Sequence, residues 1–418
     1  MSILRINGGR RLEGTIRVHG AKNSVLPIMA ASILARGETV IHNCPNLSDV
    51  NAAIKILNHL GCLVTRSEGS IAINSAGMTR CDIPHELMKE MRSSVIFLGA
   101  ILARCGKATL SMPGGCELGP RPVDLHIMAL EEMGARVTHE EGGIIKCEAA
   151  NLNGCKINFI IPSVGATENA MLAATACNGT TVITNAAREP EIWDLQKYLQ
   201  SIGVKISGAG TSTIVIEGGE IGGNTEHNVI PDRIVAATYL AAAVASCGKI
   251  ELTGANPKHI LTVTDVFSEM GCLIKTRNDA VYIDAAGANK TVKPISTTAY
   301  PGFPTDAQAP IMAACLKING TTVFIENIFE NRYRHVEELR RMGADIKVEG
   351  RVAIVTGVKQ TFGAPVESTD LRGGAALCVA ALGATGVTDV SGVEHIDRGY
   401  DSFEVSMQAL GADITRIS

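Results

Sequence analysis

The sequence predicts an α/β protein of six similar units, with three units in each of two pseudo-symmetric domains. One observation behind this prediction is a short pattern that recurs six times, in which a helix ends at a glycine and a strand follows. Repetition at a nearly even spacing indicates repeated supersecondary units. Glycine also suits the left-handed position just after a helix. The six glycines are Gly61, Gly134, Gly203, Gly271, Gly343 and Gly411.

A second pattern precedes each of these glycines. It consists of an alanine-rich helix, a glycine and a β-branched strand, such as residues 180–183 or 321–324. The alanine-rich helices are apolar on nearly every side, so we expect them to be buried. Each unit then reads as helix, strand, second helix and strand hairpin. The six buried helices are expected near residues 23–35, 93–104, 167–177, 233–246, 306–316 and 372–382.

The two chain ends supply a third observation. The sixth unit stops at Ser418 after a single strand, so its missing strands must come from elsewhere. Residues 3–6 and 12–18 read as strands joined by a Gly8-Gly9 turn, and we expect this N-terminal segment to pair beside the C-terminus. The expected domains are residues 21–230, which carry the loop described below, and residues 1–20 together with 231–418.

Composition excludes several classes of protein. Hydrophobic residues make up 46% of the chain and charged residues 19%, with a net charge of -4, so bulk charge does not indicate a nucleic-acid partner. No apolar run is long enough for a membrane helix, and the first residues lack the core of a signal peptide. Twelve cysteines without a CxxC pair are typical of reduced thiols. We therefore expect a cytoplasmic protein, and no obligatory protein partner is evident from the sequence.

The segment 113–125 is dense in glycine and proline, which predicts a loop rather than a helix or a central strand. Cys116 and Arg121 both lie on it. A cation near a cysteine stabilises the thiolate and lowers the thiol pKa, so a reactive cysteine is one interpretation. The other is a surface loop that happens to contain a cysteine.

The predicted starts of the buried helices are polar. Helix N-termini bind anions, and basic residues there oppose the helix dipole, so Lys22, Arg92, Arg233 and Arg372 indicate a bound anion. The alternative is that the acidic and hydroxyl residues are ordinary N-caps and the basic ones are solvated. If the buried helices of a domain lie parallel, their starts converge on one face. Two further groups are weaker: a local acidic group at Glu189, Glu191 and Asp194, and the histidines His126, His335 and His395, which read as structural.

Together these motifs resemble the enolpyruvyl transferase family, and the likeness runs through the whole chain. The family fold has two domains of three βαβαββ-type units each, an inside-out α/β barrel, which agrees with the repeats. No metal or organic cofactor is implied. The most specific matching segments are residues 20–23, 113–116, 121–126, 162–167, 231–233, 302–306, 328–332, 370–372 and 395–400.

The resemblance implies transfer of the enolpyruvyl group of phosphoenolpyruvate to the 3-hydroxyl of UDP-N-acetylglucosamine, with release of phosphate, as the first committed step of peptidoglycan synthesis. Lys22, Arg121 and Arg398 would hold phosphoenolpyruvate, since the planar guanidinium binds phosphate and carboxylate groups bidentately. Asp306 would accept the hydroxyl proton. Cys116 would protonate the enol methylene carbon or capture the resulting cation. The implied catalytic residues are Cys116, Asp306, Lys22 and Arg398.

The resemblance also implies a set of substrate-binding residues along the chain. One departure from the family pattern is Ile161, where some relatives carry a lysine that would contact the nucleotide phosphates. The implied substrate-binding residues are Lys22, Asn23, Arg92, Arg121, Pro122, Val123, Asp124, Leu125, Ser163, Val164, Gly165, Asp306, Ile328, Arg332, Asp370 and Arg372.

Two alternatives remain open on the sequence alone. One is the branch of the fold that uses a shikimate substrate, which lacks an equivalent of the Cys116 loop. The other is a non-catalytic protein that binds anionic ligands on the same scaffold. A binding protein needs neither a thiol acid nor a carboxylate base, so the combination of Lys22, Cys116, Asp306 and Arg398 argues against it.

Overall fold

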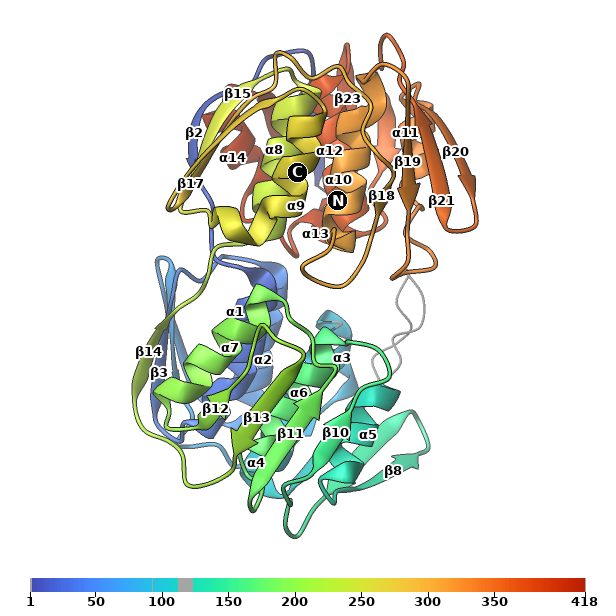
Figure 1. The fold of residues 1–418 in the computed structure, drawn as a ribbon. Coiled ribbons are helices and arrows are strands. Elements are labelled where there is room, and N and C mark those ends of the chain that lie inside the picture. Colours follow the sequence, from blue (N-terminus) through green and yellow to red (C-terminus); the bar gives the residue numbers. More distant parts are fainter. Residues whose placement is uncertain (1, 92, 112–122, 418) are drawn as a thin grey trace. The chain divides into compact units, whose positions relative to one another are not determined.

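The computed structural model describes residues 2–91, 93–111 and 123–417, and these form two compact units (Figure 1). The N-terminal unit comprises the described residues between 20 and 230. The C-terminal unit comprises residues 2–19 and 231–417. Each unit has its own buried hydrophobic core.

The six predicted repeats are present as six small sheets of four strands among the described residues, three in each unit. Every sheet has the same pattern: one strand pairs in parallel with its neighbour, and the other two pairings are antiparallel. This confirms the predicted fold class.

The N-terminal unit contains three of these sheets and seven α-helices. Its sheets have the strand orders β14-β3-β5-β4, β6-β7-β9-β8 and β10-β11-β13-β12. The strands are β3 (Glu38–His42), β4 (Leu63–Ser67), β5 (Ser70–Asn74), β6 (Asp82–Ile83), β7 (Lys107–Ser111), β8 (Arg136–Glu140), β9 (Ile144–Glu148), β10 (Lys156–Asn158), β11 (Thr180–Thr184), β12 (Lys205–Ser207), β13 (Thr213–Glu217) and β14 (Thr225–Asn228). The helices are α1 (Lys22–Ala31), α2 (Ser48–Leu60), α3 (His85–Glu90), α4 (Phe97–Cys105), α5 (Asp124–Glu132), α6 (Val164–Ala174) and α7 (Pro190–Ser201).

The C-terminal unit repeats this organisation. Its sheets have the strand orders β16-β17-β15-β2, β18-β19-β21-β20 and β22-β23-β1-β24. The strands are β1 (Ile3–Asn7), β2 (Glu13–Arg17), β15 (Lys249–Thr253), β16 (Leu273–Arg277), β17 (Ala280–Asp284), β18 (Ile295–Ser296), β19 (Thr321–Ile325), β20 (Asp345–Glu349), β21 (Val352–Thr356), β22 (Pro365–Glu367), β23 (Val387–Ser391) and β24 (Asp413–Ile417). The helices are α8 (Arg233–Ala245), α9 (Leu261–Glu269), α10 (Thr305–Ala314), α11 (Val336–Arg341), α12 (Leu371–Gly383), α13 (Val393–Ile396) and α14 (Phe403–Ala409).

The six predicted buried helices correspond to α1, α4, α6, α8, α10 and α12, and they are apolar and buried as expected. Their ends differ in detail, because short 3₁₀ turns at Ser32–Leu34, Ser94–Ile96 and Cys315–Lys317 take the place of α-helical residues. The six glycines predicted to follow helices all have positive φ, for example 97° at Gly61, so that prediction is also confirmed.

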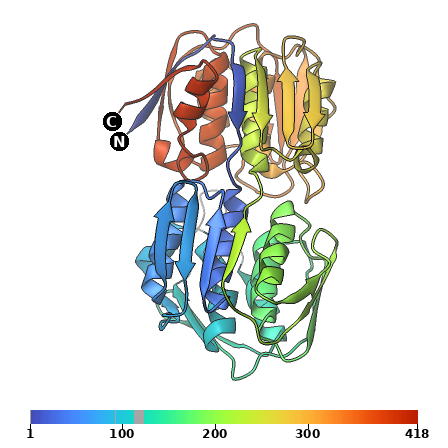
Figure 2. The ribbon, with the colours of Figure 1, turned by 90° about the vertical axis from the view of Figure 1, so that its left-hand side faces the viewer.

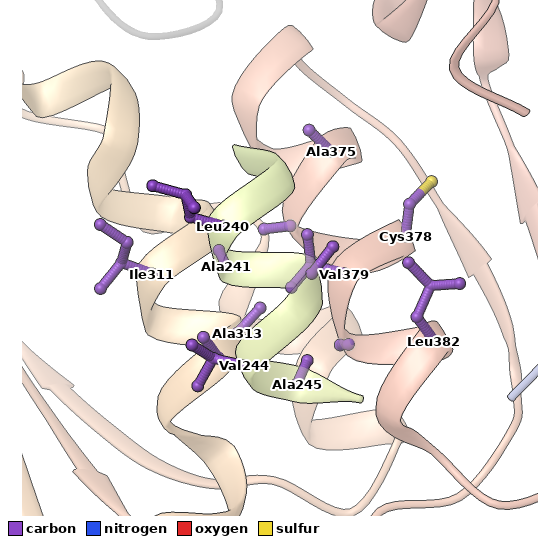
Figure 3. Packing of buried hydrophobic residues seen from close by; sticks show 14 of the residues in the cluster. Leu240, Ala241, Val244, Ala245, Ile311, Ala313, Ala375, Cys378, Val379 and Leu382 are labelled. Carbon is purple, nitrogen blue, oxygen red and sulfur yellow. The ribbon is translucent and has the colours of Figure 1, made fainter. Parts of the chain in front are cut away.

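In the C-terminal unit, α8, α10 and α12 pack against one another in pairs. Their facing side chains are mostly alanine, valine and leucine, as Figure 3 shows for Ala241, Val244 and Val379. Small residues let the helices approach closely. A Cβ added at Gly383 of α12 would lie only 2.5 Å from the carbonyl oxygen of Ala245 in α8. Burying each valine or leucine stabilises this cluster by roughly 1.5–3 kcal/mol relative to exposure.

The N-terminal strands are only partly where the sequence predicts them. As expected, β1 pairs beside the C-terminus, lying between β23 and β24, so the two chain ends lie side by side (Figure 2). The strand predicted at residues 12–18 is present, but the sheet predicted for it is wrong. Here β2 runs parallel to β15 and completes the sheet of the fourth unit instead of the sixth. The sixth sheet already has four strands once β1 is inserted, whereas β15 offers an unpaired edge.

Candidate functional site

Asp306 lies in the first turn of α10, where the helix dipole favours a carboxylate. Its side chain is 30% exposed, and it accepts hydrogen bonds from two arginines. Arg332 Nη2 donates to Oδ1 at 3.0 Å, and Arg372 donates to Oδ2 from Nη2 at 3.2 Å and from Nε at 3.3 Å. Because Arg372 is in the first turn of α12, the starts of α10 and α12 meet at this carboxylate, in agreement with the predicted convergence of helix starts.

The two guanidinium groups around Asp306 are almost fully buried, at 3% exposure each. In the described part of the chain, Arg332 Nε and Arg372 Nη1 have no hydrogen-bond partner. Burial lowers the pKa of Arg372, but Tyr400, Asp306 and Asp232 outweigh burial, so its pKa stays above the ordinary arginine value. Two permanently charged groups with donors to spare beside a part-exposed carboxylate suit an anionic or oxygen-rich ligand.

Asp370 caps the N-terminus of α12, as predicted for an N-cap residue. Its Oδ1 accepts from the backbone N–H groups of Arg372 and Gly373, both at 3.0 Å. Its Oδ2 is buried and has no hydrogen-bond partner among the described residues. A Cβ at Gly373 would lie 2.5 Å from Asp370 Oδ2 and 3.0 Å from His335 Cβ, so the carboxylate and the imidazole flank the same spot.

His335 is 2% exposed, and its environment affects its charge. Burial lowers the pKa of the imidazole from 6.5 to about 4, Asp370 opposes this shift, and Arg332 adds to it. The side chain is therefore neutral at pH 7 next to the charged groups that line the candidate site. Its predicted structural role agrees with this neutral, buried state.

The lowered pKa of His335 predicts a pH-dependent stability. Between pH 6.5 and 4 the unfolded chain binds a proton at this imidazole and the folded chain does not, so the free energy of unfolding falls as pH drops through this window. The loss is up to about 1.4 kcal/mol per pH unit. Denaturant titrations of the protein and of His335→Gln across this range test it. The difference between them should change over the window, and parallel stability curves would contradict the expectation.

In the N-terminal unit, Lys22 is the first residue of α1 and is 7% exposed. Its Nζ forms an ion pair with Asp49 Oδ2 at 2.6 Å, and Asp49 lies in the first turn of α2 at 1% exposure. The ion pair compensates each buried charge with the other and orients the ammonium group at the helix start, next to Asn23. Asp49 is not among the predicted site residues, because an acidic residue in the first turn of a helix is an ordinary helix-start signal and does not indicate which residue it pairs with.

Two predicted groups of substrate-binding residues come together at the starts of α5 and α6. Ser163 caps α6, since its hydroxyl accepts from the backbone N–H of Ala166 at 3.3 Å. A Cβ at Gly165 would lie 3.0 Å from His126 Cε1, so α6 begins against the first turn of α5. Of the predicted residues there, Val123 is buried and Asp124 is exposed, while Leu125, Val164 and Gly165 are half-buried. Ile161 precedes α6 and is 60% exposed.

Of the remaining predicted site residues, some are described by the structure and others lie outside the described residues. Arg398 lies half-buried in the turn after α13, in the C-terminal unit. Ile328 is 45% exposed in the loop after β19, the same loop that carries Arg332. Lys22 belongs to the N-terminal unit and Asp306 to the C-terminal unit, and the structure describes each unit by itself. Arg92, Cys116, Arg121 and Pro122 lie outside the described residues.

The acidic group that follows β11 in the third unit includes a residue that connects several elements. Asp194 is buried and accepts from the hydroxyl of Ser24, from the backbone N–H of Ile230 at 3.2 Å, and bonds His227 Nε2 at 2.9 Å. It thereby connects α7 to α1 and to the segment after β14. Glu168 of α6 is also buried, and burial, followed by the charges of two neighbouring glutamates, raises its pKa well above the ordinary value.

The described residues contain no group of three or more potential metal ligands, and no helix in the described ranges is long and apolar enough to cross a membrane. Eleven of the twelve cysteines are described, and all eleven are free thiols.

Comparison with known proteins places the chain among enolpyruvyl transferases. Residues 6–407 match the family EPSP synthase (3-phosphoshikimate 1-carboxyvinyltransferase). The chain is 51% identical over 417 residues to UDP-N-acetylglucosamine 1-carboxyvinyltransferase 2 of Caldanaerobacter subterraneus subsp. tengcongensis, covering 100% of both chains. It is 46% identical over 418 residues to UDP-N-acetylglucosamine 1-carboxyvinyltransferase 1 of Symbiobacterium thermophilum, covering 99% of this chain and 94% of the relative.

Two solved structures have a similar fold. The enolpyruvyl transferase NikO from Streptomyces tendae superposes with a TM-score of 0.89 at 25% identity, covering 99% of this chain and 98% of that one. EPSP synthase from Acinetobacter baumannii superposes with a TM-score of 0.75 at 18% identity over 100% of both chains. The second likeness concerns the fold alone.

Proposed function

Because the chain belongs to the EPSP synthase family of carboxyvinyltransferases, we propose that it transfers the enolpyruvyl group of phosphoenolpyruvate to the 3-hydroxyl of UDP-N-acetylglucosamine and releases phosphate. The observation that carries this proposal is the 51% identity, over the full length of both chains, to a relative named for that activity. The reaction would serve peptidoglycan synthesis, as a first committed step.

We assign the proton-accepting role to Asp306. Its carboxylate is part-exposed, while the two arginines that donate to it are buried, so the carboxylate is the group that a sugar hydroxyl can reach. Each carboxylate oxygen has two acceptor positions, and bonding to one arginine leaves room for another donor. As the sugar oxygen forms its bond to C2 of phosphoenolpyruvate, its proton passes to Asp306.

Cys116 is assigned the second proton transfer, by its place in the family motif. Its thiol gives a proton to C3 of phosphoenolpyruvate as C2 is attacked. Loss of inorganic phosphate from C2 and return of a proton from C3 to the Cys116 thiolate then restore the double bond in the product and the thiol. Lys22 and Arg398 would neutralise the phosphate and carboxylate of phosphoenolpyruvate. The other predicted contacts of the sugar nucleotide at Asn23, the α5 and α6 starts and Ile328 remain part of this proposal.

Phosphate release measured with phosphoenolpyruvate and each of two acceptors tests the proposed function. We expect release with UDP-N-acetylglucosamine and none with 3-phosphoshikimate, the acceptor after which the family is named. The enolpyruvyl product should be confirmed by mass spectrometry. Release with 3-phosphoshikimate alone would favour the other branch of the family, and binding of both substrates without release would favour a non-catalytic binding protein.

We also propose a location and a domain organisation for the protein. The protein would work in the cytoplasm and need no obligatory protein partner. The domain boundaries 21–230 and 1–20 plus 231–418 would also delimit its two functional halves, of which the first carries Cys116.

A further inference from the structure

Glu326 is a buried carboxylate that the reaction as proposed does not use. It follows directly after β19 and is 1% exposed. Among the described residues it forms no ion pair, yet burying a carboxylate is costly unless its oxygens are satisfied. Three protein donors satisfy them: the backbone N–H groups of Ile328 and Phe329 at 2.8 and 3.0 Å, and the hydroxyl of Thr305 at 3.0 Å.

These three donors come from two separate elements. Thr305 is the first residue of α10 and the neighbour of Asp306 in the chain, whereas Ile328 and Phe329 belong to the loop after β19. Oε1 of Glu326 accepts from the loop, and Oε2 accepts from the helix start. One rigid carboxylate therefore fixes the distance between the loop and the start of α10.

The same loop reaches the start of α10 a second time. Arg332 Nη2 donates to the carbonyl oxygen of Thr305 at 3.0 Å and to Asp306 Oδ1 at 3.0 Å. The loop is thus bonded to the start of α10 from both ends of the loop segment 326–332. Glu326, at one end, bonds Thr305, and Arg332, at the other end, bonds Thr305 and Asp306. Arg332 touches the proposed base itself, whereas Glu326 acts only through Thr305 and the loop backbone.

The part of the loop whose backbone N–H groups bond Glu326 also carries a large apolar side chain at the surface. Ile328 is 45% exposed although it is large and apolar, and its own backbone N–H is one of the groups that Glu326 holds. An apolar side chain that faces solvent from a fixed backbone is suited to contact a ligand, because little conformational entropy is lost when the ligand binds.

We infer that Glu326 is a positioning residue, which sets the placement of Asp306 and of Ile328 relative to each other. This inference rests on the proposed roles of those two residues. Glu326 contacts no reacting atom. Its carboxylate couples the proposed base to the proposed sugar-nucleotide contact, so that both groups are in place before the substrate binds.

The first test compares Glu326→Ala with Glu326→Gln in steady-state phosphate release. The alanine variant loses all three contacts, and we expect kcat to fall roughly 10- to 100-fold, since a misplacement of about 1 Å can cost this much. KM for UDP-N-acetylglucosamine should rise because Ile328 is released. Glutamine can accept from both loop N–H groups and donate to the Thr305 hydroxyl, so Glu326→Gln should recover most of the lost turnover.

A matched control comes from the segment directly after β18, which bonds to the same loop. Thr297 is 0% exposed, and its hydroxyl accepts from the backbone N–H of Asn327 at 2.9 Å, but it has no bond to the start of α10. Thr297→Val should therefore lower the melting temperature with kcat unchanged. An equal loss of kcat in Thr297→Val and Glu326→Ala would overturn the inference, because any loosening of the loop would then suffice.

A second variant keeps the test decisive if Glu326→Ala does not fold. Thr305→Val removes only the hydroxyl that joins α10 to Glu326. We expect it to lower kcat without changing KM for UDP-N-acetylglucosamine, since the loop side of the carboxylate stays intact. Wild-type kcat in Thr305→Val would overturn the inference. If Asp306→Asn also retained turnover, the assignment of Asp306 as the base would be wrong. If Asp306→Asn lost turnover while Thr305→Val kept it, only the positioning role of Glu326 would be wrong.

Discussion

Replacing Asp306 with asparagine is expected to reduce turnover by roughly 100- to 10,000-fold, the usual contribution of a positioned proton acceptor. The amide cannot take up the hydroxyl proton at neutral pH. It also presents an N–H₂ group to one of the two buried arginines that now donate to the carboxylate. Substrate affinity should change much less than kcat, because the neighbouring helix starts remain. Phosphate release under saturating substrates and calorimetric binding of UDP-N-acetylglucosamine measure the two quantities.

A carboxylate of the same unit provides the control for this experiment. Asp389 accepts two hydrogen bonds at 2.8 Å from Arg5 between β23 and β1, on an exposed surface. Surface pairs of this kind contribute little, so Asp389→Asn should leave both turnover and folding nearly unchanged. An Asp306→Asn enzyme within threefold of the parent would show that another group accepts the proton. Asp232, which caps α8, would then be the next residue to replace.

The second large effect is expected at Cys116. We predict that fosfomycin, an epoxide that mimics phosphoenolpyruvate in this family, alkylates Cys116 selectively among the twelve cysteines. The described cysteines are poor competitors, because most are buried and burial raises the pKa of Cys62 to about 11 and of Cys147 and Cys315 to about 12. A thiol is reactive only as the thiolate, so these side chains stay inert near pH 7.

Substitutions separate the acid role of Cys116 from its reactivity. Cys116→Asp should keep turnover, since a carboxylic acid can deliver a proton, and should resist the epoxide, which a carboxylate opens poorly. Cys116→Ser should lose most activity, because a hydroxyl is too weak an acid. Peptide mass mapping after treatment, with and without UDP-N-acetylglucosamine, checks the site. Cys105 and Cys247 are exposed and provide the controls. The variants Cys105→Ser and Cys247→Ser should be inactivated by fosfomycin to the same extent as the parent.

Two outcomes would contradict this assignment. An adduct on another cysteine, with Cys116 unmodified, would place the reactive thiol elsewhere. Complete inactivation of the Cys116→Asp variant by the epoxide would show that inhibition does not proceed through this side chain.

The local features of the fold could be predicted from the sequence because each depends on a few neighbouring residues. Gly61 and its five counterparts end helices since a left-handed backbone at that position favours glycine. The buried helices follow from runs of apolar residues on every face. Asp232 and Asp370 cap helices, as their residue type and position indicate.

Contacts between residues far apart in the sequence could not be predicted from these local patterns. The alternation in residues 12–18 shows a strand but not that its partner is β15 rather than the sixth sheet. Lys22 stands out at a helix start, while nothing in the sequence marks Asp49 as its buried partner. Glu326 could have been suspected as a polar residue directly after an apolar strand, although only the fold shows that it bonds Thr305.

The placement of β1 and β2 also affects the order in which the chain can fold during translation. These strands are synthesised before the rest of the described chain, but Leu4 of β1 pairs with Val390 and Arg416, which follow only after residues 20–386 have been made. The unit that spans residues 20–230 contains every strand of its own sheets, including β14, and can fold while synthesis continues. The sixth sheet of the other unit can close only after β23 and β24 have been synthesised. Until then, β1 remains unpaired and exposed to association with other nascent chains.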